Sequence, residues 1–216
     1  RAVNEMPEAY KLDLHSGFDK FGGGNFDEIY RRTELIRVGE VDVRVPSAED
    51  HLRVLSIHML REGAWRPLWL CDVAAAVESR PEGFDWNHCL GRNKRWANWV
   101  FCALRLAREL LGADISGTPA GAYIKPLPRW LVPVILKEWE KLSPSMRQRH
   151  RAPMASYWYY RSGILMGFRN RWPNPIEATI SVKGLFNGLP RFPFQLGSYL
   201  ARSVQFASRV TKNSRQ

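Results

Sequence analysis

Cysteine is scarce in this chain, and long apolar runs are missing. The 216 residues include three cysteines, Cys71, Cys89 and Cys102, which are far apart and form no Cys-x-x-Cys pair. This pattern argues against a disulfide framework or a zinc knuckle and favours a reducing compartment. The longest apolar run, at 130–136, is much shorter than the ~20 residues of a membrane span, and a signal segment is missing. We therefore expect a cytoplasmic protein without a transmembrane segment.

Acidic residues almost disappear from the C-terminal third. Residues 1–142 contain 20 Lys/Arg and 20 Asp/Glu, whereas residues 143–216 contain 12 Lys/Arg and a single acid, Glu177. The whole formal charge of +11 therefore belongs to the last 74 residues. Such an excess predicts an anionic partner for residues 143–216. Charge alone leaves nucleic acid, a lipid surface and an acidic protein face open.

Residues 1–46 show the alternation of β-strands. The stretch 35–45 predicts a hairpin, because Gly39 suits the first position of a two-residue turn. The second strand has three valines that are expected to form its buried face: Val41, Val43 and Val45. Glu40 and Asp42 alternate with these valines and could form a pair of metal-binding carboxylates. A solvated outer face is the better interpretation of this pair.

Residues 47–216 show helical periodicity, and short-range signals mark the expected helix ends. The expected helix starts are Ser47 with Asp50, Pro67 and Asp85, and the expected stops are Gly63 and Gly112. Further helices are expected at 127–142, 157–170 and 196–207.

These patterns predict an α+β fold. A small remnant of a mixed sheet, one strand plus a hairpin, precedes a mostly helical C-terminal domain. The expected divisions are the strands at 1–46, a helical bundle core at 47–116 and a basic helical region at 117–216. So small a sheet cannot cover both of its faces, so something else must complete it.

Asp13 is the first candidate for chemistry. In the segment Leu12-Asp-Leu-His15, alternation places the leucines on one face and Asp13 with His15 on the other. A carboxylate on a strand face near a sheet edge can hold magnesium in phosphoryl transfer. A two-metal site needs several carboxylates, however, and a lone strand carboxylate is usually only solvated. Locally, Asp13 is interpreted as solvated, with a metal ligand as the alternative.

Two helical positions form a second candidate. Asp72 lies among apolar residues and is expected to be substantially buried, so its charge needs a partner. His58 and Arg61, on the preceding helix, are the expected partners. A metal site made of His51, His58 and Asp72 has no tight ligand spacing to support it. We interpret His58 and Asp72 as a structural buried pair, with Arg61 as the other partner available to Asp72.

Arginines alternate with aromatic residues in the stretch 157–172. Within it, Arg161, Arg169 and Arg171 are candidates for contact with an anion. Arginine and aromatic side chains together can grip phosphates and stack on bases, and they also suit a lipid interface. A core helix with a solvated basic face explains the pattern equally well.

Several motifs follow one another between residues 10 and 113. They are Leu12-Asp-Leu-His15, Phe26-Asp-Glu-Ile-Tyr-Arg-Arg32, Val38-Gly-Glu-Val-Asp-Val-Arg-Val45, Ser47-Ala-Glu-Asp50, Leu55-Ser-Ile-His58 and Leu68-Trp-Leu-Cys-Asp72. In this order they resemble the bacterial nucleotidyltransferase-like proteins of the DNA polymerase β superfamily. The resemblance is strongest to the uncharacterised branch named nucleotidyltransferase family protein, and it is looser from Lys125 onward.

The resemblance implies a mixed sheet on which a Gly-Ser turn, an Asp-x-Asp pair and a third carboxylate act together. The carboxylates of this family hold Mg²⁺, which aligns a nucleoside triphosphate for transfer of its nucleotidyl group to an acceptor. Asp13 matches the third carboxylate, as catalytic residue and metal ligand. His15 matches the histidine that follows it, as a cofactor-binding residue. His58 and Asp72 match helical positions that we interpret as scaffold.

The sequence departs from the family pattern at its start. The Asp-x-Asp pair is missing, and Gly197-Ser198 is no substitute because it opens a helix. Without the pair, these residues cannot assemble a two-metal site alone. We expect either the C-terminal part of a longer enzyme, which the Arg1 start favours, or a degenerate copy. The alternative function is a non-catalytic module whose basic C-terminal helices contact nucleic acid, an anionic membrane surface or a partner protein.

Overall fold

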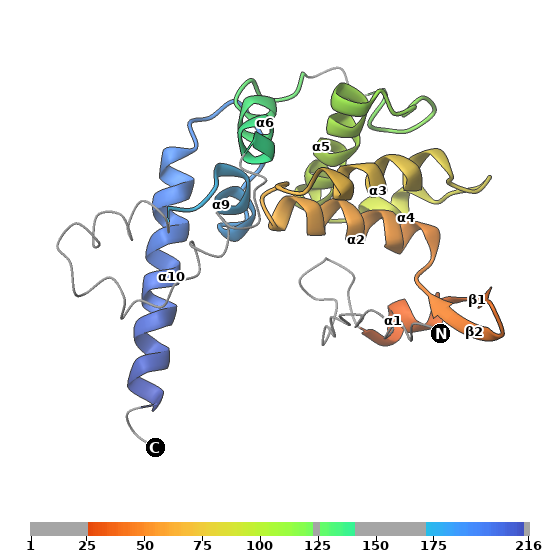
Figure 1. Ribbon diagram of the computed structural model, residues 1–216, viewed down its shortest axis with the longest axis horizontal. Helices are drawn as coiled ribbons and strands as arrows, with labels where there is room; N and C mark the ends of the chain where they lie inside the picture. Colours follow the sequence, from red (N-terminus) through yellow and green to blue (C-terminus); the bar gives the residue numbers. More distant parts are fainter. Residues whose placement is uncertain (1–25, 123–125, 141–171, 214–216) are drawn as a thin grey trace, which may run out of the picture.

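The computed structural model describes residues 26–122, 126–140 and 172–213, and they form a mixed α+β structure (Figure 1). The N-terminal elements are α1 (Phe26–Arg31), β1 (Glu34–Val38) and β2 (Val41–Val45). The central helices are α2 (Ala48–Arg61), α3 (Pro67–Glu78), α4 (Trp86–Leu90) and α5 (Lys94–Leu111). The C-terminal helices are α6 (Leu131–Glu140), α9 (Pro175–Ser181) and α10 (Phe192–Asn213). The expected fold class, a few strands before a mostly helical remainder, is confirmed.

Local signals set the ends of the central helices. Ser47 precedes α2, and its hydroxyl oxygen accepts the backbone N–H of Asp50 at 3.3 Å. Asp85 caps α4 in the same way, and Pro67 opens α3 in its first turn. Gly112 ends α5 with a φ of 73°, in the left-handed region that glycine adopts without strain. These four sequence predictions are confirmed.

The core lies where α2, α3 and α5 pack together (Figure 1). Each helix contributes one apolar face, and the side chains that are completely buried include Leu52, Leu60, Val73, Val77, Val100 and Leu104. Burial of one such side chain stabilises a fold by about 1.5–3 kcal/mol. Three tryptophans join distant segments to this core through their indole N–H groups. Trp99, Trp130 and Trp139 donate to the carbonyls of Gly184, Asn187 and Ala64 at 2.8, 2.8 and 2.9 Å.

Arg191 organises the turn between α9 and α10. It is only 6% exposed, and its guanidinium lies 4.8 Å from the ring centroid of Trp130 and 4.1 Å from that of Phe194. Its N–H groups donate to oxygens of Thr179, Leu185, Asn187 and Leu189. Burial lowers the pKa of this side chain. The hydrogen bonds to uncharged oxygens compensate the buried cation.

Arg191→Lys is expected to lower the free energy of unfolding by about 1–3 kcal/mol, because an ammonium cannot reproduce the planar fork of donors and leaves buried carbonyls unpaired. Urea denaturation followed by circular dichroism measures the change. The control is Arg202→Lys, which alters an exposed ion pair with Glu177 and should change stability by less than about 1 kcal/mol. Equal effects of the two substitutions would contradict the role given to Arg191.

The hairpin has the predicted turn and outer face. β1 and β2 pair antiparallel with Val38 opposite Val41, and Gly39 has a φ of 59°. Arg37 lies across from Asp42 and contacts its carboxylate at 3.2 Å. Asp42 and Glu40 are both exposed to solvent, as the sequence predicted.

The prediction that the valines of β2 form a buried face is wrong. Val41 is 62% exposed, Val43 is also exposed, and Val45 is half-buried. Val38 and Ile36, on the same face by register, are exposed as well. Alternation predicts which side chains share a face, but burial requires a covering layer, and the described residues place none over these two strands.

The segment that precedes the hairpin is helical, although it lies within the region of β alternation. Asp27 and Glu28 occupy the first turn of α1 and Arg31 the last, an arrangement that complements the helix dipole. Among the helices that the structure describes, none has both the length and the apolar character to cross a membrane.

Candidate functional site

Five residues that the sequence analysis singled out lie outside the described residues. They are Asp13, His15, Arg161, Arg169 and Arg171. The helix expected at 157–170 is also outside the described ranges. Their proposed roles therefore stay predictions.

His58 and Asp72 lie on the neighbouring helices α2 and α3, and both are half-buried. Asp72 is therefore less enclosed than the sequence suggested. The ring of His58 meets that of Trp69 edge-on, with centroids 4.9 Å apart. The structure shows a histidine–aromatic contact between α2 and α3, and the pairing of His58 with Asp72 stays a prediction.

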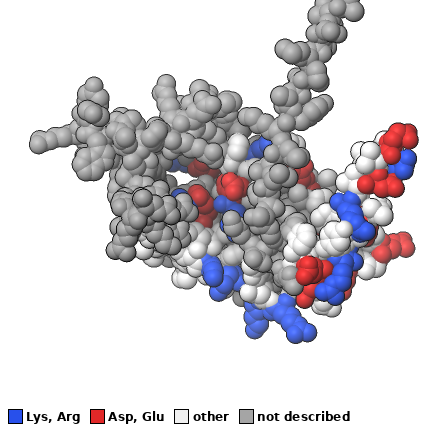
Figure 2. All heavy atoms as spheres, turned by 90° about the horizontal axis from the view of Figure 1, so that it is seen from below, with Lys and Arg blue, Asp and Glu red and all other residues white. Residues whose placement is uncertain are grey.

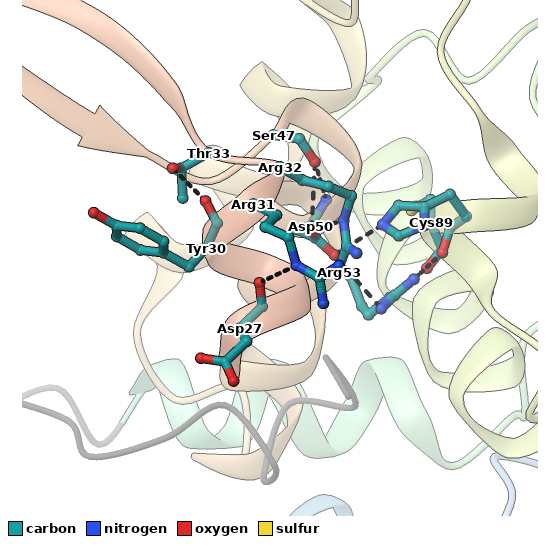
Figure 3. A network of polar contacts seen from close by, with 10 residues as sticks. Asp27, Tyr30, Arg31, Arg32, Thr33, Ser47, Asp50, Arg53 and Cys89 are labelled. Carbon is teal, nitrogen blue, oxygen red and sulfur yellow. Dashed lines mark hydrogen bonds and ion pairs between the residues drawn. The ribbon is translucent and has the colours of Figure 1, made fainter. Parts of the chain in front are cut away.

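A buried carboxylate, Asp50, is the centre of a polar cluster (Figure 3). Asp50 is 2% exposed in the first turn of α2. Its Oδ2 accepts from Nε of Arg32 at 2.9 Å, and its Oδ1 lies 3.1 Å from Nε2 of His88 and 3.6 Å from the guanidinium of Arg53. Three side chains that can carry positive charge therefore surround one buried acid.

Arg53 extends this cluster to the end of α4. Its Nε donates to the carbonyl of Cys89 at 2.6 Å, and a terminal nitrogen donates to the carbonyl of His88. These carbonyls belong to the last turn of α4, where helix carbonyls have no partner within the helix and the dipole favours a cation. Arg53 is itself buried. Its charge is balanced by Asp50 on one side and by the helix end on the other.

The beginning of α4 is held to α2 by a second carboxylate. A side-chain oxygen of Glu49 accepts the backbone N–H of Asp85 at 3.1 Å, and Asp85 in turn caps α4. Arg32 follows α1 directly, so the cluster connects the end of α1 with the start of α2 and with α4. We call Arg32, Asp50, Arg53 and His88 the Asp50 cluster.

Opposing effects act on the ionisation of Asp50. Burial tends to raise its pKa, whereas the hydrogen bonds and charges of Arg32 and His88 lower it. The net effect is a pKa below the usual value, so Asp50 is ionised at neutral pH. Both of its oxygens are engaged by protein groups. This arrangement can orient neighbouring segments, but it leaves no free oxygen for a metal.

No group of three or more His, Cys, Asp or Glu side chains within the described residues is arranged to hold a metal ion. A magnesium centre of the kind implied by the resemblance therefore cannot be assembled from these residues. Its expected ligand, Asp13, lies outside them.

A depression of about 990 Å³ lies between α4 and the loop that follows α5. Trp86 of α4 lines it together with Arg108 and Asp114. The depression thus combines an aromatic surface with one charge of each sign. Because α4 is held in place by the Asp50 cluster, that cluster also positions one wall of the depression.

Charges of both signs are interspersed on the described surface seen from below (Figure 2). Lys/Arg groups lie beside Asp/Glu groups on the part of the described surface that this view shows. This mixture agrees with the equal numbers of basic and acidic residues in residues 1–142.

Sequence reasoning did not identify the Asp50 cluster. Asp50 was visible only as part of the helix start with Ser47, and Arg53, one turn later, was a usable signal for an ion pair on the same face. His88 is 38 residues away from Asp50 and lies in a segment without any pattern that pairs the two. Only the tertiary packing of α4 on α2 brings them together.

Comparison of the chain with known proteins identifies its family. A family model described as uncharacterised nucleotidyltransferase matches residues 5–112, half of the chain. The chain belongs to this nucleotidyltransferase family. The resemblance inferred from the motif order is thereby confirmed, and the matched range includes Asp13, His15 and the whole Asp50 cluster. No curated protein and no solved structure gives a significant match to the chain.

Proposed function

We propose that the intact protein transfers a nucleotidyl group from a nucleoside triphosphate to an acceptor in a magnesium-dependent reaction. The family match over residues 5–112 is the observation that carries the proposal. In this proposal Asp13 serves as one magnesium ligand, and His15 is a cofactor-binding residue. A carboxylate oxygen is the type of donor that Mg²⁺ prefers, and the ion commonly binds one or two protein carboxylates together with substrate phosphates.

The described residues supply no metal-binding group, and they support this proposal by the way they hold neighbouring elements together. The matched segment runs from residue 5 to residue 112, and within it the Asp50 cluster joins the end of α1 to α2 and α4. We propose that the cluster fixes α1, which follows the Asp13 segment in the sequence, relative to the helical body, and that the helical body shapes the acceptor site. The division of the chain into regions 1–46, 47–116 and 117–216 is also part of this proposal.

The first test is to read the complete coding sequence. A Gly-Ser turn followed by Asp-x-Asp, encoded upstream of Arg1, is the expected result, because the family resemblance implies that an Asp-x-Asp pair acts together with Asp13 in a two-metal site. An upstream sequence without these motifs would contradict the enzymatic proposal.

The second test measures nucleotide binding by the complete protein. Fluorescent nucleoside triphosphate analogues should bind at least about tenfold more tightly in millimolar Mg²⁺ than in EDTA, because the ion bridges carboxylates and phosphates. Fluorescence anisotropy measures the affinity for each of the four bases. Binding that ignores magnesium would argue against the proposed site, and nucleoside monophosphates serve as the control ligand.

A further inference from the structure

Helix α10 carries a row of exposed apolar side chains. Phe192, Leu196, Leu200 and Val204 follow one another at four-residue spacing, and Val204 is exposed to 69%. Residues four apart lie on one face of a helix, so the row is continuous along about three turns. These four residues are called the apolar stripe below.

The opposite face of α10 packs on the protein. Phe194 covers the guanidinium of Arg191, Ser198 is completely buried, and Arg202 forms an ion pair with Glu177 of α9. These residues are two positions away from members of the stripe, which is about 200° around the helix axis. Amphipathic helices usually bury their apolar face, whereas α10 leaves the apolar stripe exposed.

The exposed apolar surface continues beyond the helix. Val182, Leu185 and Leu189, in the turn between α9 and α10, are exposed as well. The side chain of Val182 lies 3.4 Å from the Cβ position of Gly197, so this turn adjoins α10. Figure 1 shows α10 running past α9 and extending beyond the other labelled helices. Contiguous apolar surface of this kind marks an interaction site.

The charge of this region distinguishes among the partners. The sequence of α10 includes Arg202, Arg209 and Lys212 and no acid, and residues 143–216 carry 12 basic residues against one acidic residue. Exposed Lys183 lies beside the apolar turn. A second copy of the chain would carry the same formal net charge of +11, which opposes association. Nucleic acid would be attracted by the charge, but it offers no apolar counterpart for the stripe.

An anionic lipid surface matches both the exposed apolar stripe and the excess of basic residues in this part of the chain. Helices with an apolar face and basic polar residues lie in the plane of the membrane interface, with the apolar face among the acyl chains and the cations at the headgroups. The exposed side chain of Lys183, beside the apolar turn, is long enough to reach the headgroups. Trp172, which stacks on Phe192 at 5.8 Å, is a residue type that prefers this interface.

We propose that α10 docks the protein on a membrane surface rich in anionic phospholipids, with the apolar stripe as its contact. The docking is peripheral and is independent of nucleotidyl transfer. It would hold the matched nucleotidyltransferase region close to the membrane.

Co-flotation of the full chain with lipid vesicles tests this proposal. Vesicles of phosphatidylcholine with about 30% phosphatidylglycerol should bind the protein, whereas pure phosphatidylcholine vesicles should bind it at least about tenfold more weakly. Raising the salt from about 0.1 to 0.5 M should weaken binding, because the headgroup charges are screened.

A matched pair of variants separates the stripe from apolar surface in general. Leu200→Ser with Val204→Ser should reduce vesicle partitioning by about 100-fold, because two side chains no longer enter the acyl region. Val38→Ser with Val41→Ser removes two exposed apolar side chains from the hairpin and should leave partitioning unchanged. Thermal denaturation should give the same Tm for the stripe variant as for the unaltered chain.

Four results would overturn the proposal. One is no binding to anionic vesicles, even where the chain binds DNA. Another is equal loss of binding in the hairpin variant. A third is a light-scattering mass of a dimer that the stripe variant converts to a monomer, which would identify a second copy or an equivalent protein as the partner. The last is a clear fall in Tm of the stripe variant, which would mean that the stripe packs within the chain.

Discussion

Asp50→Ala is expected to lower the free energy of unfolding by about 3–5 kcal/mol, the range for removing one member of a buried ion pair. The carboxylate is almost completely buried, and its loss leaves buried Arg53 without its counterion. Arg32 and His88 lose their shared acceptor at the same time. Urea denaturation monitored by tryptophan fluorescence and circular dichroism measures the change.

The matched control for this substitution is Asp42→Ala on the hairpin. Asp42 also pairs with an arginine, Arg37 at 3.2 Å, but the pair is exposed. Exposed pairs contribute about 0–1 kcal/mol, so the control should remain close to the unaltered chain. Similar losses from Asp50→Ala and Asp42→Ala would show that the Asp50 cluster does not connect the elements as the structure indicates.

The contribution of Asp50 should also depend on pH in a defined direction. Its pKa in the folded state is lower than the usual value, so its stabilising effect is present above the unfolded-state pKa of about 3.9 and is lost as the pH falls through the folded-state pKa. The difference in unfolding free energy between the unaltered chain and Asp50→Asn should therefore be constant near neutral pH and shrink below about pH 4. A difference that grows in acid would contradict this assignment.

Asp13→Asn, made in the complete protein, is expected to reduce turnover by about a thousandfold. Magnesium supplies several kcal/mol of transition-state stabilisation in phosphoryl transfer, and each 1.36 kcal/mol corresponds to a factor of about ten. The amide of asparagine keeps the size of the side chain but removes the negative charge that holds the ion. Release of pyrophosphate from nucleoside triphosphate, followed in saturating Mg²⁺, measures turnover.

The control for Asp13→Asn is Asp42→Asn, because Asp42 was the other strand carboxylate considered as a ligand and is exposed beside Arg37. The control should retain activity, and circular dichroism spectra of both variants should match that of the unaltered protein. Retained turnover in Asp13→Asn would remove Asp13 from the catalytic site. Loss of turnover together with loss of the folded spectrum would instead assign Asp13 a role in stability.

The sequence by itself determined the helix ends and the family. Ser47, Pro67, Asp85 and Gly112 act within a few residues of their own positions, so their effects do not depend on distant packing. The two-residue turn at Gly39 is local in the same sense. The motif order around Asp13 was likewise sufficient to indicate the nucleotidyltransferase family.

Tertiary structure decided which side chains are buried and which charges meet. The valines of β2 alternate as a buried strand would, yet they are exposed, because alternation says nothing about a covering layer. Asp50 and His88 are 38 residues apart, and their contact depends on how α4 lies against α2. The periodicity of α10 predicted a helix with an apolar face, but only its packing on α9 showed that this face points away from the protein. Burial and ion pairing depend on neighbours in space, which a linear pattern does not specify.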